Sequence, residues 1–402
     1  MTQHEISLGE LVRAFAHMLP GAGDVIVYGG TSLDAATLRE ESVFTLNCRA
    51  SDAYAPWALE DGLQAIERRL SVRRLPLPPK LFAGAWARFA GMIDEEVVRE
   101  LLRVLVPGGL ITIIGPTAEA GAGESSHQLF SCLESEPNLL GVLALAGSGG
   151  RKAMVYRQST DANPTATEDC GFCPPMRFRL NKRTGLPGAA GVLWGDEEFL
   201  VIPDVAPIAP GHLLLLTTQH YLSMGAIPEK SYGLLEDYVS RIDRIMRAGF
   251  GKPAIFIEHG ATKPHQAGSC IDHAHWHCLP DTGAIMENLG RLGMQGHAGQ
   301  LQQAKKLHDS HLPYFLARDH DNQLFFPANG LPCQFLRLVA AAGRNVVNPR
   351  WQNTLISADN RARYGETIRR TVVQVDGFQL DDVLQDISAL QSMAPSMEMM
   401  DE

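Results

Sequence analysis

The stretch Gly268–Pro280 reads GSCIDHAHWHCLP and decides what kind of domain surrounds it. Its three histidines, His273, His275 and His277, occupy alternate positions. Alternate side chains of a β-strand point to one face, so a strand gathers the three imidazoles, whereas a helix would scatter them. Neighbouring imidazoles disfavour charge on one another, which predicts a largely neutral group near pH 7, the form that nucleophiles and metal ligands need. The alternative is a His-rich strand with structural hydrogen bonds only.

The sequence around the histidines predicts a small α+β layer. Apolar runs bounded by turn residues indicate strands, and apolar residues at helical spacing indicate a helix between them. The expected strands are Glu197–Pro203, Gly211–Thr217, Ala254–Glu258 and Ile271–Leu279, and the expected helix is Tyr232–Ala248. Further along the chain, a hairpin and a helix are expected at Tyr314–Arg318, Gln323–Pro327 and Pro332–Ala342.

The first 157 residues alternate strand and helix patterns, which predicts an α/β unit with a mostly parallel sheet. Strands are expected at Asp24–Tyr28, Ser42–Leu46, Leu110–Ile114, Asn138–Ala146 and Lys152–Arg157, and helices at Leu59–Leu70 and Glu95–Val106. We therefore divide the chain into an α/β domain (1–157), a linker (158–169), the histidine-bearing domain (170–300), its C-terminal extension (301–384) and a tail (385–402). The tail has few core positions and is expected to be disordered.

Composition and charge exclude several classes of protein. The 402 residues are 45% hydrophobic and 20% charged, which is typical of a globular chain. A net charge of −10 argues against a nucleic-acid polymer as partner, and no apolar run is long enough to cross a membrane. The first residues lack a signal-peptide pattern, so we expect a cytoplasmic protein. Seven cysteines, an odd number in a large chain, predict a protein without disulfides.

The histidine stretch resembles the signature of the histidine triad (HIT) superfamily, in which three histidines alternate with hydrophobic residues. His273 to Leu279 follow that pattern. The resemblance extends upstream to Asp204-Val205-Ala206-Pro207, to Pro210-Gly211-His212 and to the strand that leads to His220. It implies a HIT domain with an antiparallel sheet over residues 170–300, and it also implies a homodimer.

The resemblance implies an enzyme that acts on a nucleotide-containing small molecule through a covalent nucleotidyl-histidine. His275 would be the nucleophile, and His277 would contact the phosphate. Gly268, Ser269 and Cys270 occupy the phosphate approach, where many members of the family have Gln and Ser or Thr at the last two positions. That departure weakens any detailed assignment of how the leaving group is activated.

Two acidic residues complete the predicted nucleotide site. Asp204 matches the position that binds ribose hydroxyls in the family, and a turn residue that caps its own backbone is the alternative. Glu258 lies on the predicted strand before the triad and is the second candidate. Arg337, in the predicted C-terminal helix, either reaches a phosphate or is an ordinary surface residue.

The reaction that fits this pattern best is hydrolysis of a nucleoside phosphoramidate, a dinucleoside polyphosphate or a nucleotide-conjugated metabolite. A nucleotidyltransferase or phosphorylase of the same superfamily is the first alternative. A nucleotide sensor without enzymatic activity is the second. The intact triad argues against the sensor, because sensing alone does not require a nucleophile.

Cys170 and Cys173 form a C-x-x-C pair, which in a cytosolic chain suggests metal binding or redox chemistry. Some bacterial members of the HIT superfamily combine such a pair with a histidine at the end of the second strand and the first triad histidine to bind zinc. That resemblance implies a structural zinc held by Cys170, Cys173, His220 and His273, which fixes the orientation of the histidine strand. A redox pair and a vestigial site are the alternatives.

The segment Leu101–Ile114, LLRVLVPGGLITII, resembles the late helix–turn–strand of class I S-adenosylmethionine-dependent methyltransferases. The resemblance implies a Rossmann-like fold for residues 1–157. The loop Gly29–Asp34 lacks the G-x-G pattern that lets backbone amides close on the cofactor. We therefore expect a degenerate domain that serves packing or partner binding without S-adenosylmethionine. A bifunctional enzyme that also methylates is the alternative.

Overall fold

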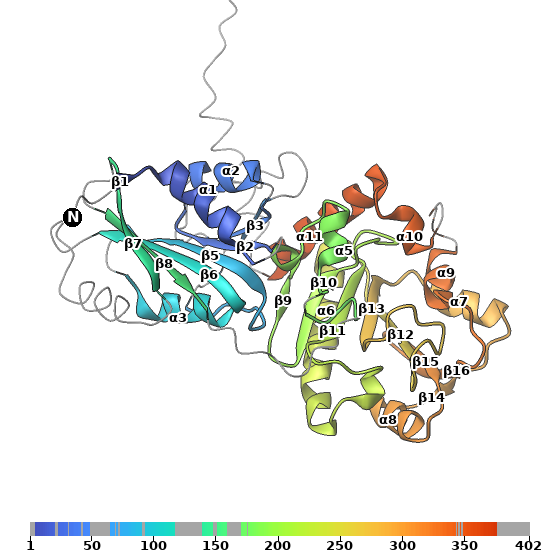
Figure 1. Ribbon diagram of the computed structural model, residues 1–402. Coiled ribbons are helices and arrows are strands. Elements are labelled where there is room, and N and C mark those ends of the chain that lie inside the picture. The colour runs from blue at the N-terminus through green and yellow to red at the C-terminus, as the bar shows by residue number, and fades with distance from the viewer. Residues whose placement is uncertain are drawn as a thin grey trace, which may run out of the picture.

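The computed structural model describes residues 5–20, 23–30, 32–41, 43–48, 65–68, 70, 73–90, 93–116, 139–147, 151–158, 170–174, 176–342, 344, 346 and 349–375. These residues form two eight-stranded sheets, one built from β1 to β8 and one from β9 to β16 (Figure 1). The predicted linker, apart from Gln158, and the predicted tail lie outside the described residues. The domain boundaries therefore stay predictions.

The N-terminal sheet is mostly parallel and carries helices on both faces. Its strands run in the order β1-β7-β8-β6-β5-β2-β3-β4, and β8 is antiparallel to both of its neighbours. The strands are β1 Glu5–Ile6, β2 Val25–Tyr28, β3 Thr45–Cys48, β4 Ala65–Arg68, β5 Phe82–Arg88, β6 Leu105–Pro116, β7 Leu139–Leu145 and β8 Arg151–Arg157. The helices are α1 Leu8–Met18, α2 Ser32–Glu40 and α3 Glu95–Arg103. This arrangement confirms the predicted α/β class.

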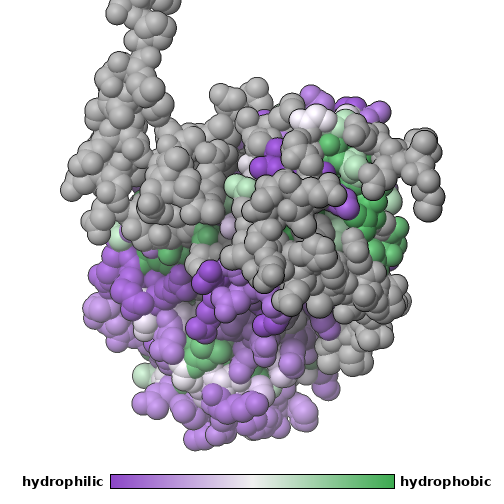
Figure 2. All heavy atoms as spheres, turned by 90° about the vertical axis from the view of Figure 1, so that its left-hand side faces the viewer, coloured by the Kyte–Doolittle hydropathy of each residue, from purple (hydrophilic) through white to green (hydrophobic). Residues whose placement is uncertain are grey.

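Two apolar clusters show how these helices cover the sheet. Phe15 of α1 packs edge-on against Trp86 on one face, and Val97 and Leu101 of α3 pack on the opposite face. Helix α3 begins after Asp94, whose carboxylate accepts hydrogen bonds from the first free backbone amides of the helix. Figure 2 shows that hydrophilic residues cover much of the described surface on this side of the molecule.

The second sheet is antiparallel throughout and has the histidine strand near its centre. The strand order is β14-β16-β15-β12-β13-β11-β10-β9. The strands are β9 Trp194–Gly195, β10 Phe199–Pro203, β11 Leu213–Thr217, β12 Ala254–Gly260, β13 His275–Pro280, β14 His297–Ala298, β15 Tyr314–Arg318 and β16 Gln323–Pro327. Strand β13 lies between β11 and β12, so both of its edges are paired. The predicted hairpin at β15 and β16 is confirmed.

Helices pack against both faces of this second sheet. Trp276 and Cys278 point into a core that they share with α6, and α6 also contacts α11. His277 points to the opposite face, on which Ile257 and Leu279 pack with residues of α7 and α9. The helices are α5 Arg179–Arg183, α6 Tyr232–Phe250, α7 Ala284–Arg291, α8 Leu301–Asp309, α9 Phe335–Ala341, α10 Trp351–Thr354 and α11 Ala358–Val375. None of the helices in the described residues combines the length and hydrophobicity that a membrane span requires.

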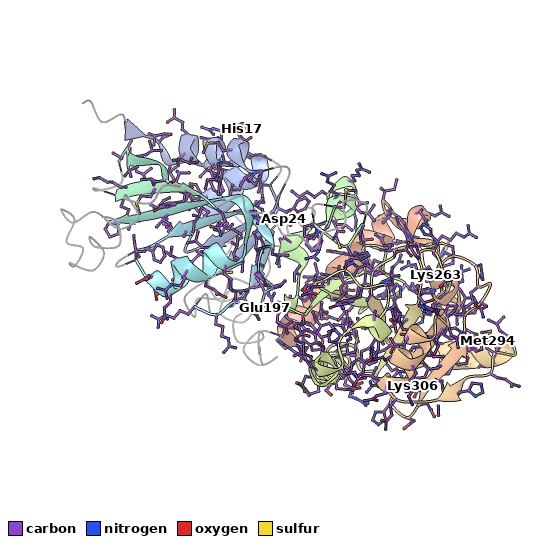
Figure 3. All side chains as sticks on the ribbon, turned by 60° about the horizontal axis from the view of Figure 1, so that its bottom comes forward. His17, Asp24, Glu197, Lys263, Met294 and Lys306 are labelled. Atoms are coloured by element: carbon purple, nitrogen blue, oxygen red, sulfur yellow. A yellow bond between two sulfur atoms is a disulfide. The ribbon has the colours of Figure 1, made fainter. Side chains whose placement is uncertain are left out.

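The two sheets meet at Asp24, which precedes β2 and is labelled in Figure 3. Its Oδ2 accepts hydrogen bonds from the backbone amides of Gly188 (2.9 Å) and Ala190 (2.8 Å). The ammonium of Lys182 lies 3.3 Å from its Oδ1. One apolar cluster continues from the N-terminal sheet into the second sheet, so the two units share a buried hydrophobic core at their junction.

One predicted helix in the N-terminal unit is wrong. In the described part of Leu59–Leu70 the chain forms strand β4, which pairs in parallel with β3. Ile66, Arg68 and Leu70 are buried at alternate positions, which is the period of a strand and outweighs the helical spacing of the apolar residues. Strand β5 escapes prediction because its sequence, FAGAWAR, is rich in Ala and Gly, which are uncommon in strands.

Candidate functional site

Four side chains that the sequence predicts as metal ligands converge at the start of the histidine strand. Cys170 and Cys173 come from the segment before α5, His220 follows β11, and His273 precedes β13. Their ligand atoms all lie within 4.8 Å of one another. The four residues thus form a group that can hold a metal ion.

The distances within this group fit a zinc ion. Cys170 Sγ lies 3.4 Å from His273 Nδ1, and Cys173 Sγ lies 3.4 Å from His220 Nδ1 and 3.5 Å from His273 Nδ1. Tetrahedral zinc, with bonds of about 2.3 Å to sulfur and about 2.0 Å to nitrogen, separates these atoms by roughly 3.6 Å. A hydrogen bond with Cys173 and burial raise the pKa of the Cys170 thiol, so the pair ionises readily only beside a cation.

His273 connects this group to the next histidine. Its Nε2–H donates to the backbone carbonyl of Thr217 (2.8 Å), which leaves a lone pair on Nδ1 facing the two sulfurs. The backbone carbonyl of His273 accepts a hydrogen bond from His275 Nδ1 (2.6 Å). The residue whose ring would bind the metal therefore orients His275 through its main chain.

His275 is held as a neutral imidazole with a lone pair on Nε2. Because Nδ1 donates to His273, the single proton of the neutral ring resides on Nδ1. Burial and the neighbouring His277 lower the pKa of His275 to about 3. Phe172, between the two predicted cysteine ligands, packs edge-on against the ring at a centroid distance of 5.3 Å. A neutral, oriented imidazole of this kind is a competent nucleophile.

A hydrogen-bond chain gives His277 the opposite tautomer. The amide of Ile208 donates to His212 Nδ1 (3.2 Å), so neutral His212 carries its proton on Nε2. Burial lowers the pKa of His212 well below its usual range, which keeps the ring neutral. His212 Nε2 lies 3.0 Å from His277 Nδ1, so Nδ1 accepts and neutral His277 carries its proton on Nε2. With ring centroids 5.0 Å apart, His275 and His277 offer a lone pair and an N–H donor next to each other.

Asp204 lies behind these rings and is engaged by protein groups. Its Oδ1 accepts a hydrogen bond from the backbone amide of Ala206 (2.7 Å). This contact is the one expected of a turn residue that caps its own backbone, which is the alternative to ribose binding. Its Oδ2 lies 3.0 Å from Arg337 Nη1 and 3.6 Å from His277 Nδ1. Arg337 is buried, so of its two alternatives the ordinary surface arginine is wrong. Asp204, His212 and His277 also approach within 4.8 Å, but Arg337 already supplies the positive charge that a metal ion would bring.

Residues 189–284, which include β10 to β13 and the histidine strand, match the family model described as HIT domain. The chain carries a HIT domain. This match confirms the resemblance inferred from the alternating histidines and the predicted fold class of this region. A HIT domain supports a nucleotide-processing function in general. Cys170 and Cys173 precede the matched residues, and the segment with Arg337 follows them.

Solved structures similar to this chain match its N-terminal region. They include the cyclase SpnF, at 17% identity over 40% of this chain and 88% of that chain, with a TM-score of 0.32. An S-adenosylmethionine-dependent methyltransferase from Mesorhizobium loti matches at 16% identity over 36% and 96%, with a TM-score of 0.30. Geranyl diphosphate methyltransferase matches at 13% identity over 37% and 77%, with a TM-score of 0.30. The Rossmann-like description of residues 1–157 rests on the strand order given above.

The loop after β2 contacts β5 at the carboxyl end of the N-terminal sheet. In open α/β sheets, ligands bind at the carboxyl ends of neighbouring strands, here β2 and β5. Gly29 follows β2 and has a φ of +61°. Its backbone lies so close to β5 that a Cβ would be 2.1 Å from the Arg88 carbonyl oxygen. Asp34, whose side chain is fully buried, lies 3.5 Å from Arg88 Nη1. Gly29 and Asp34 of this loop thus both lie against Arg88 of β5.

Glu258 lies on the other side of the sheet from the HIT histidines. It is directly opposite Trp276 on β13, and cross-strand partners share a face, so Glu258 points into the core under α6. Its Oε1 accepts from the amide of Met224 (2.6 Å), and its Oε2 accepts from the Tyr314 hydroxyl (3.1 Å). The prediction that Glu258 contacts the nucleotide is wrong because the register places its side chain away from His277.

The predicted phosphate approach contains a disulfide, contrary to the expectation from the odd cysteine count. Cys270 is bonded to Cys333, which precedes α9, so the prediction of a chain without disulfides is wrong. Ser269 is buried and donates to the backbone carbonyl of Ile271 (2.8 Å). Gly268 has a φ of +75°, and a Cβ there would lie 2.6 Å from the Pro332 carbonyl. A residue with a side chain would therefore push the C-terminal segment away from this loop.

His259 also belongs to the histidine face, although no motif in the sequence assigns it a role. Its ring centroid lies 6.4 Å from that of His277, and its Nδ1–H donates to the carbonyl of Ala267 (2.6 Å). Burial lowers the pKa of His259 to about 4. The signal for it is the alternation along β12, because Ile257 is directly opposite His277 and His259 is two residues further.

Proposed function

We propose that this protein hydrolyses a nucleotide-containing small molecule through a covalent nucleotidyl-histidine intermediate on His275. The observation that carries the proposal is the pair of opposite tautomers. His275 has a lone pair on Nε2, and His277 has a proton on Nε2, which is the combination that attack on a phosphoryl group requires. The HIT domain supports the nucleotide as the substrate class.

In the first step, the Nε2 lone pair of His275 forms a bond to the α-phosphorus. The bond from phosphorus to the leaving group breaks, and the leaving group departs with its electron pair and takes up a proton from solvent. His275 becomes an imidazolium, whose Nδ1–H remains bonded to the His273 carbonyl. His277 donates its Nε2–H to a non-bridging phosphoryl oxygen, where negative charge increases in the transition state.

In the second step, water attacks the same phosphorus and the phosphorus–nitrogen bond breaks. The electron pair returns to Nε2 of His275, and the proton of the water passes to solvent, so a nucleoside monophosphate leaves and the ring is neutral again. A nucleotidyltransferase or phosphorylase would use the same intermediate with another acceptor, such as inorganic phosphate, in place of water.

We infer that Cys170, Cys173, His220 and His273 hold a structural zinc ion. When bound, zinc fixes the ligands and takes no part in the phosphoryl chemistry. The chain links the zinc ligands to the nucleophile, because the backbone carbonyl of His273 accepts the Nδ1–H of His275. Ordering of His273 therefore orders the nucleophile.

We also infer that the N-terminal unit acts by docking and does not use S-adenosylmethionine. The contact of Gly29 with Arg88 and the buried Asp34 support this inference. Titration calorimetry of the full chain with S-adenosylmethionine should give no binding heat. A saturable signal at one site per chain would refute the inference and favour a bifunctional enzyme.

A substrate screen followed by phosphorus NMR tests the proposed reaction. The panel consists of adenosine 5′-phosphoramidate, dinucleoside polyphosphates and nucleotide sugars, each with and without inorganic phosphate. Hydrolysis yields a nucleoside monophosphate in both conditions, whereas a phosphorylase yields a nucleoside diphosphate only when phosphate is present. The His275→Asn variant should be inactive, and the exposed His297→Asn variant should retain full activity. Nucleotide binding without turnover of any member would favour a sensor.

A further inference from the structure

Arg337 is an arginine of the C-terminal segment, 60 residues beyond His277, yet it is buried beside the histidines. Its Nη1 donates to Asp204 Oδ2 (3.0 Å), and its Nη2 donates to the carbonyl of Ala206 (2.6 Å). Its Nε donates to the carbonyl of Pro349 (3.3 Å). Buried arginines are rare without a partner, and this one has a carboxylate and two carbonyls.

The helix that carries Arg337 is fastened to the loop before the histidine strand. Cys333 is bonded to Cys270, and the amide of Gln334 donates to the carbonyl of Gly268 (2.9 Å). Helix α9 begins at the next residue. The C-terminal segment is therefore attached on one side to the predicted phosphate approach and, through Arg337, on the other side to Asp204.

Asp204 is the group through which Arg337 reaches the histidines. Its Oδ2 lies 3.5 Å from His212 Nε2 and 3.6 Å from His277 Nδ1, the two atoms that share the proton of the relay. Burial disfavours the carboxylate, but the Arg337 guanidinium outweighs it and holds the pKa of Asp204 well below its usual range. An unbalanced carboxylate at this place would attract a proton onto His277 Nδ1 and reverse the direction of the relay.

We propose that Arg337 is a positioning residue for His277: by balancing the charge of Asp204 it keeps His212 as the donor and His277 as the acceptor, so that His277 offers its Nε2–H to the substrate. This proposal rests on the proposed function for the role of that N–H, whereas the state of the His277 ring is independent of any substrate. On this proposal, the C-terminal segment that carries Arg337, which lies outside the matched residues 189–284, contributes to the function of the site.

The state of the His277 ring is read by nitrogen NMR on the full chain with labelled histidine, with His277→Asn to assign the signal. Asp204, His212, His275 and His259 are the titratable groups that face this ring. Arg337→Gln removes the charge at similar length, and Arg337→Lys retains it. Arg363→Gln is the matched control, because Arg363 donates to the carbonyl of Pro207 in the same turn.

In the wild type and in Arg337→Lys, we expect the His277 ring to carry its proton on Nε2, with Nδ1 accepting from His212. In Arg337→Gln, we expect the ring to carry its proton on Nδ1, facing Asp204, and to lose the Nε2–H, with a kcat that falls about 10- to 100-fold at nearly constant KM for the best substrate of the screen. Arg363→Gln should change neither quantity. If the His277 signal and kcat of Arg337→Gln equal those of the wild type, the proposal is overturned.

Two further outcomes separate a folding defect and a wrong function from a wrong proposal. If Arg337→Gln does not fold, the double variant with Asp204→Asn removes both buried charges. The proposal expects His277 protonated on Nε2 in that variant, and a ring protonated on Nδ1 there would contradict it. If even the wild type turns over no substrate, the proposed function fails, whereas the His277 signal of the variants still decides the role of Arg337.

Discussion

The buried position of Glu258, on the face of the sheet opposite His277, can be tested quantitatively. Burial raises the pKa of Glu258 to about 7 from its ordinary value of 4.5. Because the folded state holds the proton more tightly than the unfolded chain, stability is highest below pH 4.5 and falls as the pH rises towards 7. Each pH unit between the two values is worth about 1.4 kcal/mol, so the ionised Glu258 costs the folded protein about 3 kcal/mol above pH 7.

The Glu258→Gln variant removes this cost and can still contact Met224 and Tyr314. Urea unfolding, followed through tryptophan fluorescence, is measured from pH 5 to pH 8. The stability of the variant relative to the wild type should increase by about 2 to 3 kcal/mol over this range. Glu287→Gln, on the exposed face of α7, is the control and should show no such trend. A flat difference for Glu258→Gln, or loss of turnover in that variant, would refute our placement of Glu258 in the core.

Three other changes test the remaining features. Cys173→Ser removes one predicted zinc ligand. Elemental analysis should find one zinc per chain in the wild type and none in the variant, and the free energy of unfolding should fall by at least ~3 kcal/mol. A variant that retains zinc would contradict the ligand set. Peptide mapping without reductant should recover Cys270 linked to Cys333, and replacing both by Ser should cost about 4 kcal/mol for a loop of this length; two free thiols would contradict the disulfide. Asp24→Ala leaves two buried amides without their acceptor and should cost about 1 to 3 kcal/mol and speed proteolysis between the two sheets; unchanged proteolysis would argue against docking through Asp24.

The local part of the site is readable from the sequence. The alternation of His273, His275 and His277 needs only the period of a strand, and the C-x-x-C pair brings two sulfurs together by spacing alone. Strands β10 to β13 are bounded by turn residues, so they are predicted to within a few positions. The predicted and observed strands differ at the start of β13. His273 is expected within the strand, but it precedes β13 and its ring faces Cys170.

The rest of the site depends on contacts between distant segments. Whether Glu258 points to the histidines or away from them is set by the register of β12 on β13, and a shift of one residue would reverse it. Arg337 and Asp204 are 133 positions apart, and Cys270 and Cys333 are 63 apart. No periodicity links such pairs, so only the folded chain reveals that the C-terminal segment closes on the site.

The central claim is that His275 becomes covalently nucleotidylated during turnover. Acid-labile modification of the full chain is measured by rapid quench at neutral pH and intact-protein mass spectrometry, with peptide mapping under basic conditions. We expect the wild type to gain the mass of one nucleotidyl group on His275 within a single turnover and to lose it as product appears. A wild type that converts substrate with no such adduct, or a His275→Asn variant that retains full turnover, would contradict the account.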